Sequence, residues 1–333
     1  MLEKPDLEDQ AIITCLQAHY GVMVLTLEFL PIGNDASAWV YRVRAADGQT
    51  WFLKVRKGTV YESALTIPRY LRDQGLRQVV APIPAHNGKL WIAVENFALI
   101  LYPYIDGVTG MEKGMSEAQW REFGTVLKQI HSLQLPAELL NQVQRENFVP
   151  KWSAAAREID ALINAGNYDQ GSAVKSELAA FWLSRQAEIL RIIERCEELG
   201  QQLQTIAPKL ILCHADIHTA NILIDQQGKL FIVDWDQPIL APVERDLMFA
   251  PGNGSREATL FFEGYDVTTI DPLALAYYCY EWVVQEIGDY GERVFLMSDT
   301  GEATLQDSVR GFKQLFDPGD VVEGAYQTEI GLS

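Results

Sequence analysis

The segment from Leu210 to Asp236 decides how the rest of this chain is interpreted. It reads Leu-Ile-Leu-Cys-His-Ala-Asp-Ile-His-Thr-Ala-Asn-Ile-Leu-Ile-Asp-Gln-Gln-Gly-Lys-Leu-Phe-Ile-Val-Asp-Trp-Asp. Apolar runs on either side of the Gln-Gln-Gly turn predict a β-hairpin, and a polar loop precedes it. Asp216 and Asn221 lie on that loop, and Asp234 follows the second strand. The segment therefore sets three polar groups at fixed intervals between apolar strands.

A carboxylate, an amide and a second carboxylate with this spacing suit phosphoryl transfer. In such a site Asp216 orients an attacking hydroxyl and accepts its proton, while Asn221 and Asp234 hold Mg²⁺ against the phosphates of a nucleotide. A metal-dependent hydrolase with His214 and Asp216 as ligands is an alternative, but the sequence offers no second His/Asp pair of that kind. Phosphoryl transfer also requires a cation near the phosphates.

Lys54 is the cation that the sequence offers. Period-2 hydrophobic patterns predict three early strands, near residues 25–31, 39–45 and 51–55. On the third strand Lys54 alternates with Leu53 and Val55, so its side chain lies on the opposite face. A lysine there can reach nucleotide phosphates, although taken alone the pattern also fits an edge-strand lysine that faces water.

The loop between the first two strands is a candidate phosphate cover. It contains Gly33 and Ser37 in the sequence Gly-Asn-Asp-Ala-Ser. A single glycine does not make a Gly-x-Gly-x-x-Gly motif, and the pattern alone also fits a hairpin turn. Small residues at these positions would let backbone N–H groups cover phosphates.

Helical periodicity dominates the rest of the chain. Ser116 and Gln119 predict a capping box at a helix start, and we interpret His131 near the end of that helix as a packing histidine. The other predicted elements are a first helix near residues 6–19, another hairpin formed by residues 79–84 and 90–94, and two long helices near residues 174–200 and 272–290.

Composition excludes several classes of protein. Of the 333 residues, 48% are apolar and 22% are charged, as in globular proteins, and the length allows two core-forming units. The four cysteines form no Cys-x-x-Cys pair, so neither a zinc site nor a disulfide framework is indicated. The charged N-terminus excludes a secretory signal, and the longest apolar run, near 97–105, is too short to span a membrane. We therefore expect a cytoplasmic protein.

The formal net charge of −18 is unevenly distributed. Residues 213–333 carry a net charge of −15 and residues 1–212 carry −3. This field disfavours nucleic acid and anionic membranes as partners and would attract a cationic ligand. The alternative is a solvated acidic surface that serves solubility.

The segment His-Ala-Asp216-Ile-His-Thr-Ala-Asn221, followed by Ile-Val-Asp234, resembles the catalytic signature of the aminoglycoside phosphotransferases and choline kinases, the small-molecule branch of the protein-kinase-like proteins. The resemblance extends over nearly the whole chain, including Trp-Phe-Leu-Lys54 and Phe-Phe-Glu-Gly-Tyr265. It implies an α+β, bilobal protein-kinase-like fold. Residues 1–105 would form a small nucleotide-binding lobe with an antiparallel sheet. Residues 106–333 would form a larger, mainly helical catalytic lobe, with a linker near 102–107 and a helical insertion near 146–205.

The resemblance also implies roles around the nucleotide. Lys54 would contact the phosphates and be held by Glu62, the only acid between Lys54 and Asp73. A solvated Glu62 at a helix start is the alternative. In the linker, the Pro103 carbonyl would accept a hydrogen bond from adenine and the Ile105 N–H would donate one.

Two further roles concern the catalytic loop itself. Asp246 would accept backbone N–H bonds from the loop and fix its shape, unless it serves only as a helix cap. His214 would brace the loop backbone, and His218 receives no role beyond packing.

The expected reaction is transfer of the γ-phosphate of ATP, with Mg²⁺, to a hydroxyl of a cationic aminocyclitol or aminoglycoside of the spectinomycin kind, which would confer antibiotic resistance. GTP is not excluded as the donor, and the oligomeric state stays open. Candidates for an acidic substrate wall are Asp236, Glu263, Asp266 and Glu281. The alternative is a metabolic kinase of a small hydroxylated amine or amino acid, of the choline, homoserine or hydroxylysine type. A binding module without activity would need a lost catalytic group, and none is lost.

Overall fold

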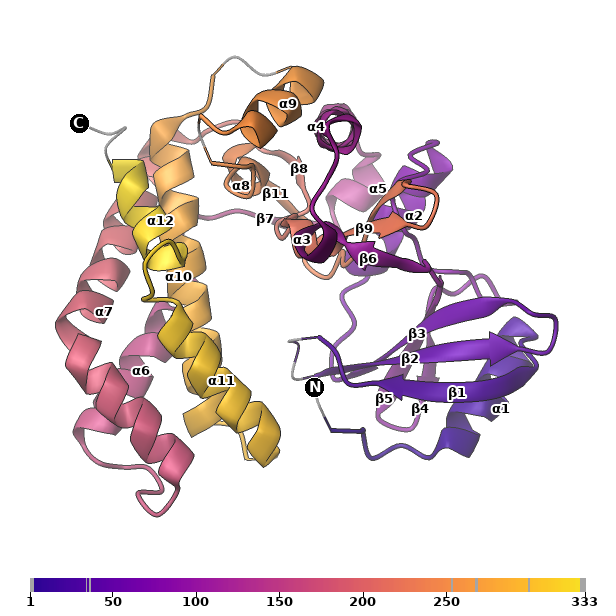
Figure 1. Ribbon diagram of the computed structural model, residues 1–333, viewed down its shortest axis with the longest axis horizontal. Coiled ribbons are helices and arrows are strands. Elements are labelled where there is room, and N and C mark those ends of the chain that lie inside the picture. Colours follow the sequence, from indigo (N-terminus) through magenta and orange to yellow (C-terminus); the bar gives the residue numbers. More distant parts are fainter. Residues whose placement is uncertain are drawn as a thin grey trace. The chain divides into compact units, whose positions relative to one another are not determined.

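The computed structural model describes residues 3–33, 35, 37–252, 254–266, 269–298 and 300–329. The chain forms two compact units (Figure 1), the first from residues 1–145 with 210–268 and the second from residues 146–209 with 269–333. An antiparallel N-terminal sheet and a mainly helical C-terminal part confirm the predicted α+β class. The division into units differs from the predicted lobes at 1–105 and 106–333, which stay a prediction.

The first unit begins with a five-stranded antiparallel sheet of order β1-β2-β3-β5-β4. One face of this sheet forms a core with helix α1, in which Leu53 and Val55 are fully buried beside Ile12 and Leu16. Strand alternation then puts Lys54 on the other face, as the sequence predicts. These elements are α1 (Asp9–Tyr20), β1 (Val24–Leu30), β2 (Ala38–Ala45), β3 (Thr50–Lys57), β4 (Ile92–Val94) and β5 (Phe97–Pro103).

The predicted hairpin of residues 79–84 with 90–94 is wrong. Only β4 forms there, and it pairs with β5, while Val79 makes an isolated bridge to Ile232. Pro82 and Pro84 explain the difference, because each lacks the N–H that a ladder hydrogen bond requires.

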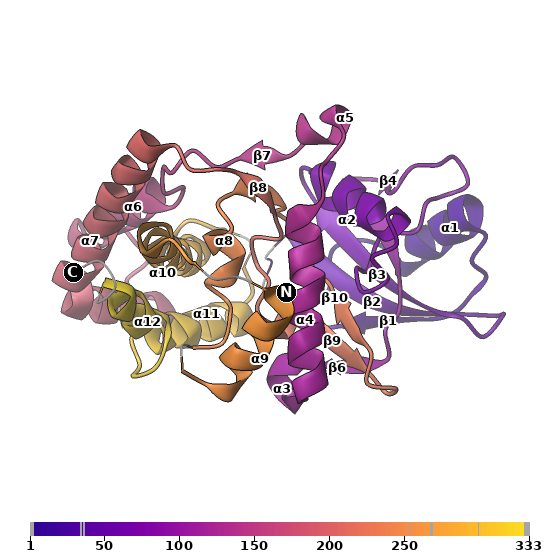
Figure 2. The ribbon, with the colours of Figure 1, turned by 90° about the horizontal axis from the view of Figure 1, so that it is seen from above.

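Short strands and helices complete the first unit (Figure 2). They form two small sheets, of order β10-β9-β6 and β7-β11-β8, and the catalytic-loop segment connects β8 to β9. The capping box predicted at Ser116 and Gln119 is confirmed at the start of α4. The elements are α2 (Ser63–Asp73), β6 (Gly107–Thr109), α3 (Gly110–Lys113), α4 (Glu117–Ser132), α5 (Ala137–Leu140), β7 (Gln144–Arg145), β8 (Ile211–Cys213), the 3₁₀ turn η1 (Thr219–Asn221), β9 (Ile222–Asp225), β10 (Leu230–Ile232), β11 (Ile239–Ala241), α8 (Glu244–Leu247) and α9 (Arg256–Tyr265).

Helices α4 and α9 cross at two glycines. A Cβ on Gly124 of α4 would meet the Phe261 carbonyl of α9, and a Cβ on Gly264 of α9 would meet the Arg121 carbonyl of α4. Phe123 and Phe261 pack edge to face beside this crossing, with ring centroids 5.1 Å apart. The backbones approach so closely because neither contact residue carries a side chain.

The second unit is a helical bundle around α10, which contacts the other four helices. Figure 2 views α10 nearly end-on with α6, α7, α11 and α12 around it. Trp182 of α7 stacks on Phe312 of α11, with ring centroids 5.3 Å apart, in the apolar centre of this bundle. The helices are α6 (Ser153–Asn164), α7 (Ala173–Ile206), α10 (Pro272–Phe295), α11 (Glu302–Gln314) and α12 (Val321–Thr328).

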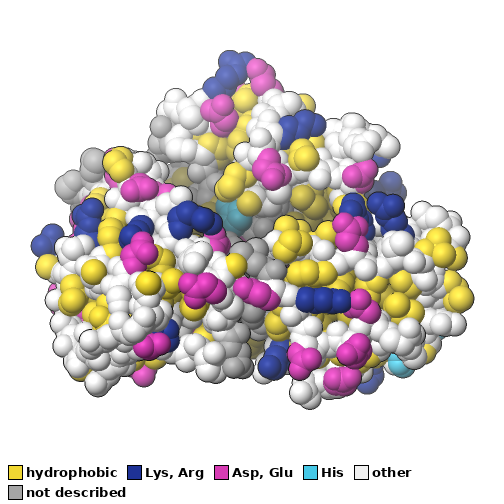
Figure 3. Space-filling model, turned by 60° about the horizontal axis from the view of Figure 1, so that its bottom comes forward, with side chains coloured by type: hydrophobic (Ala, Val, Ile, Leu, Met, Phe, Trp, Pro, Cys, Tyr) yellow, Lys and Arg dark blue, Asp and Glu magenta, His cyan; other side chains and the backbone are white. Residues whose placement is uncertain are grey.

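Two surface properties bear on possible partners. None of the helices in the described residues is both long enough and apolar enough to pass through a bilayer. On the face drawn in Figure 3, acidic and basic side chains are scattered and often adjacent rather than collected in one patch of a single sign.

We predict that Gly124→Ala destabilises the first unit by about 1–3 kcal/mol, because the new methyl group has to displace the backbone of α9. Gly252→Ala is the matched control, since no atom lies within 4 Å of its Cβ position and its φ is not positive. Thermal unfolding of both variants measures the difference. Equal melting temperatures for the two variants would contradict a backbone contact at this crossing.

Candidate active site

The catalytic-loop segment leaves β8 through a strained residue. Ala215 has a φ of 75°, in the left-handed region that a residue with a Cβ adopts at a cost of roughly 1–3 kcal/mol. The Asp246 carboxylate stabilises this turn, because Oδ2 accepts the His214 N–H at 2.8 Å and Oδ1 accepts the Ala215 N–H at 2.7 Å. One buried carboxylate thus holds two successive peptide N–H groups.

Asp246 is itself held by a buried histidine. His131 Nε2 lies 2.8 Å from Asp246 Oδ2, and His131 Nδ1 lies 2.6 Å from the Tyr265 hydroxyl. Burial by itself raises the pKa of Asp246, but the hydrogen bond and charge of His131 and the His214 N–H outweigh it and lower that pKa. The packing role predicted for His131 is therefore incomplete, since it bonds an acid 115 positions along the chain.

His214 links the loop to the segment that carries Asp234. Its Nδ1 accepts the Asp216 N–H at 3.3 Å, so its Nε2–H donates to the Val233 carbonyl at 2.9 Å. The imidazole also packs on Trp235, with ring centroids 4.4 Å apart. These contacts on both sides of the ring are what a residue that braces the loop backbone requires.

Asp216 and Asn221 lie side by side on the loop, with Asp216 exposed and Asn221 buried. The Asn221 amide nitrogen donates to the Asp216 carbonyl at 2.7 Å and to Asp216 Oδ2 at 3.1 Å. His218 Nδ1 accepts the Ala220 N–H, so its Nε2–H points to Asp216 Oδ1, 3.4 Å away. Burial raises the pKa of Asp216, but the hydrogen bond and charge of His218 outweigh this effect and lower it. Sequence reasoning missed this contact of His218.

Lys54 joins β3 to the two acids that follow β10. Its Nζ lies 2.6 Å from Asp236 Oδ2 and 3.3 Å from Asp234 Oδ1. Burial acts to lower the pKa of Lys54, but these two carboxylates raise it, so the amine stays protonated. Asp234 has a φ of 62°, a conformation that aspartate tolerates better than most residues.

The predicted pairing of Lys54 with Glu62 is not formed. Glu62 precedes α2 in a helical backbone conformation, and its Oε1 accepts the indole N–H of Trp91 at 3.2 Å. Lys54 forms ion pairs with Asp234 and Asp236 instead. The structure therefore pairs Lys54 with Asp234 and Asp236 and leaves Glu62 at a separate contact.

The loop between β1 and β2 connects to β3 through an ion pair that the sequence analysis did not identify. Asp35 Oδ1 accepts the backbone N–H and the hydroxyl of Ser37, each at 2.7 Å, and Asp35 Oδ2 accepts from Arg56 Nη1 at 2.7 Å. Gly33 in the same loop has a φ of 93°, which suits glycine. Ser37 therefore holds the loop together through Asp35.

The predicted linker follows the last pair of the β3–β5 ladder, Trp51 with Pro103. Ile105 lies two residues beyond, between β5 and β6. Within the described residues, its N–H donates no backbone hydrogen bond. A donor so placed is the kind that the predicted adenine contact requires.

The candidate substrate acids lie in different settings. Asp236 is beside Lys54, whereas the Glu263 carboxylate accepts a hydrogen bond from Arg121 of α4 at 2.8 Å. Asp266 caps the C-terminal end of α9 in a left-handed conformation. Glu281 lies on α10 in the second unit. Of these acids, Asp236 therefore lies beside Lys54, and Glu263 is paired with Arg121.

The oxygen donors of the site fit Mg²⁺, which prefers carboxylate and carbonyl oxygens. Because the amide nitrogen of Asn221 donates to Asp216, the amide oxygen of Asn221 is the atom that can bind a metal ion. His131, Cys213 and Asp246 also bring ligand atoms within 4.8 Å of one another, but the Asp246 oxygens there accept N–H groups. Asn221 and Asp234, with Asp236 nearby, are therefore the better metal candidates.

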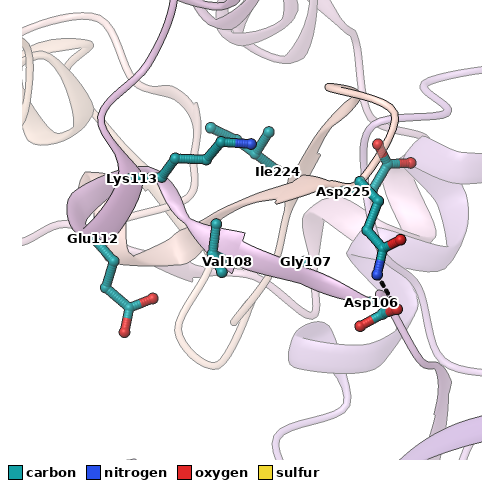
Figure 4. Close-up of a pocket in the computed structure, with 8 residues that line it drawn as sticks. Asp106, Gly107, Val108, Glu112, Lys113, Ile224 and Asp225 are labelled. Carbon is teal, nitrogen blue, oxygen red and sulfur yellow. Dashed lines mark hydrogen bonds between the residues drawn. The ribbon is translucent and has the colours of Figure 1, made fainter.

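A hollow of about 550 Å³ lies outside the group of residues described above (Figure 4). It is open to solvent, and Gln226 donates to Asp106 across one end at 2.6 Å. Glu112 takes part in the capping box of α3, and Asp225 accepts the N–H groups of its own turn. Since these acids have structural partners, size alone does not make the hollow a reaction site.

The fold and the site together define a phosphotransferase with a protein-kinase-like fold. The chain belongs to the phosphotransferase enzyme family, whose model matches residues 28–282. A structure of spectinomycin phosphotransferase in complex with ADP and spectinomycin is 32% identical, covers 98% of this chain and 99% of that one, and has a TM-score of 0.87.

Two further matches agree with this family. An AMP-bound structure of spectinomycin phosphotransferase, also 32% identical, covers 97% of this chain and 99% of that one with a TM-score of 0.82. Protein StrN of Streptomyces griseus is 26% identical over 290 residues, which cover 83% of this chain and 82% of StrN.

We predict that Asp246→Ala lowers the free energy of unfolding by about 3 kcal/mol or more, because it leaves His131 and two buried N–H groups without their acceptor. Asp47→Ala is the matched control, since Asp47 also accepts a backbone N–H, from Gln49 at 2.9 Å, but in an exposed turn. Chemical denaturation of both variants measures the difference. A loss of less than about 1 kcal/mol for Asp246→Ala would contradict a structural role.

Proposed function

We propose that the protein transfers the γ-phosphate of ATP to a hydroxyl group of a cationic aminocyclitol, with spectinomycin as the leading candidate. The observation that carries the proposal is two groups of contacts, Asp216 with Asn221 and Lys54 with Asp234 and Asp236. The N–H of Val233, the residue before Asp234, donates to the Asn221 carbonyl at 3.0 Å and joins the two groups. The 32% identity to spectinomycin phosphotransferase over nearly the whole chain supports the choice of acceptor. Resistance to the drug would follow if this reaction occurs in the cell.

In the proposed reaction Asp216 accepts the hydrogen bond of the acceptor hydroxyl and orients it towards the phosphorus atom. Asp216 suits this role because its side chain is about half exposed and His218 helps to keep it ionised. As the bond to phosphorus forms, the hydroxyl proton passes to Asp216, and the bond from phosphorus to the β-phosphate oxygen breaks. Lys54 stabilises the negative charge on the phosphates.

Asn221 and Asp234 are the proposed Mg²⁺ ligands, and the bound ion would neutralise charge on the transferring phosphate. The linker would hold adenine through the Pro103 carbonyl and the Ile105 N–H. Asp236, and the acidic C-terminal part of the chain more generally, would favour the cationic acceptor. Because ATP is an intracellular donor, the proposal also implies reaction in the cytoplasm.

The metabolic kinase of the choline, homoserine or hydroxylysine type uses the same catalytic groups and is the second candidate. A panel of aminocyclitols, aminoglycosides and these smaller amines in an ATP-consumption assay separates the two candidates by kcat/KM. The proposal predicts the highest value for spectinomycin or a related aminocyclitol. A higher value for any of the small amines would overturn the choice of acceptor and leave the metabolic kinase ahead.

We predict that Asp216→Asn lowers kcat by about 10²–10⁴-fold, because the amide cannot accept the hydroxyl proton. ATP affinity should remain nearly unchanged, since the phosphate-binding groups are intact. Steady-state kinetics with nucleotide titration measures both quantities. Wild-type turnover in this variant would contradict the role of Asp216.

We predict that His218→Asn moves the acid limb of the kcat/KM profile to higher pH. His218 lowers the pKa of Asp216, so its removal lets that pKa rise and protonates the base at a higher pH. His19→Asn, on α1, is the control and should leave the profile in place. An acid limb that stays at the wild-type pH would show that His218 does not set the ionisation of Asp216.

A further inference from the structure

Arg56 is a second cation at the same carboxylate as Lys54. It lies two residues after Lys54 on β3, so both side chains project from the same face of the strand. Lys54 Nζ lies 2.6 Å from Asp236 Oδ2, and Arg56 Nη1 lies 3.4 Å from the same oxygen. The two cations also line one small cavity together with Asp236. The guanidinium is therefore adjacent to the amine proposed to bind phosphate.

The same guanidinium holds the loop between β1 and β2. Arg56 Nη1 donates to Asp35 Oδ2 at 2.7 Å, and Nε donates to the Thr59 carbonyl at 3.3 Å. Asp35 in turn accepts both hydrogen bonds of Ser37. Arg56 is thus the direct link between the candidate phosphate-covering loop and the acids of the site.

The charges around Arg56 suit an anionic ligand. Guanidinium is always protonated, and its planar array of N–H groups matches the oxygens of a phosphate. The Arg56 side chain is 20% exposed, so it is largely removed from water yet still accessible. Among the residues that the structure describes, Nη2 makes none of the hydrogen bonds of this network. One edge of the fork therefore remains for a further acceptor.

We propose that Arg56 is a second phosphate-binding residue. Together with Lys54, it contacts the β- and γ-phosphates of the nucleotide. The inference rests on the proposed function, because it requires a nucleoside triphosphate in this site. A purely structural Arg56, which only anchors the loop through Asp35, is the competing explanation. The two explanations differ in what happens when Asp35 is removed and Arg56 is kept.

Binding of AMP, ADP and ATP, measured by calorimetry without acceptor, tests the proposal on the wild type and the variants Arg56→Gln, Arg56→Lys and Asp35→Asn. Arg56→Gln should weaken ATP binding by about 10-fold or more, ADP binding less, and AMP binding hardly at all. Arg56→Lys should lie between Arg56→Gln and wild type. Asp35→Asn breaks the same ion pair but keeps the cation, so ATP should bind as tightly as in wild type or more tightly.

Arg69→Gln is the matched control, because Arg69 on α2 forms an exposed ion pair with Asp73. It should bind all three nucleotides like the wild type, and thermal unfolding checks that every variant is folded. Equal losses in Arg56→Gln and Asp35→Asn for all three nucleotides would overturn the inference in favour of loop anchoring. Loss of ATP binding in Lys54→Ala but not in Arg56→Gln would also overturn it while the proposed function stands. A wild type that binds no nucleotide would overturn both.

Discussion

The active-site loop depends on the carboxylate of Asp246. This side chain is fully buried, and its two oxygens accept the N–H groups of His214 and Ala215 and the ring N–H of His131. A buried carboxylate is costly unless such donors surround it, and here they also stabilise the left-handed backbone of Ala215. Asp216, the residue after this turn, is exposed, whereas Asn221 is buried beside it. The shape of the loop that carries these two candidate residues therefore depends on one satisfied buried charge.

A second constraint is the balance of charge around β3. Lys54 and Arg56 lie among the acids Asp35, Asp234 and Asp236, so each cation has more than one carboxylate within reach. Such an arrangement is strongly coupled, and a ligand that brings phosphates and a divalent cation would redistribute these pairs. The same acids disfavour a free anion, so in the proposed reaction the metal ion would take part in the recognition of the nucleotide. Binding and catalysis in the proposed reaction thus draw on one electrostatic network.

The sequence predicted those features that local pattern determines. Short apolar runs and the spacing of polar residues predict the strand that carries Lys54 and the loop with Asp216 and Asn221. They also predict the position of Asp234 after a strand. Contacts between distant segments could not be predicted in this way. The sequence shows neither that His131 meets Asp246 nor that Arg56 meets Asp35, because both contacts depend on how separate elements pack.

The mistaken partner of Lys54 has the same origin. Lys54 was assigned to Glu62 by position along the chain, but the side chain of Glu62 reaches Trp91 instead. Glu263 is a substrate candidate because it is acidic, and the crossing of α4 and α9 also gives it Arg121 as a partner, which the sequence does not show. A residue type and a spacing indicate which chemistry is available, but three-dimensional packing decides which partner each group receives.

The most direct test of the claim that Asp246 shapes the catalytic loop is amide hydrogen exchange of the Asp246→Asn variant. The side chains are nearly equal in size, so the helix crossing of α4 and α9 should keep its protection. We expect faster exchange at His214 and Ala215 than in the wild type, confined to the loop and its immediate neighbours. Unchanged protection of these two amides in a folded Asp246→Asn variant would contradict this claim.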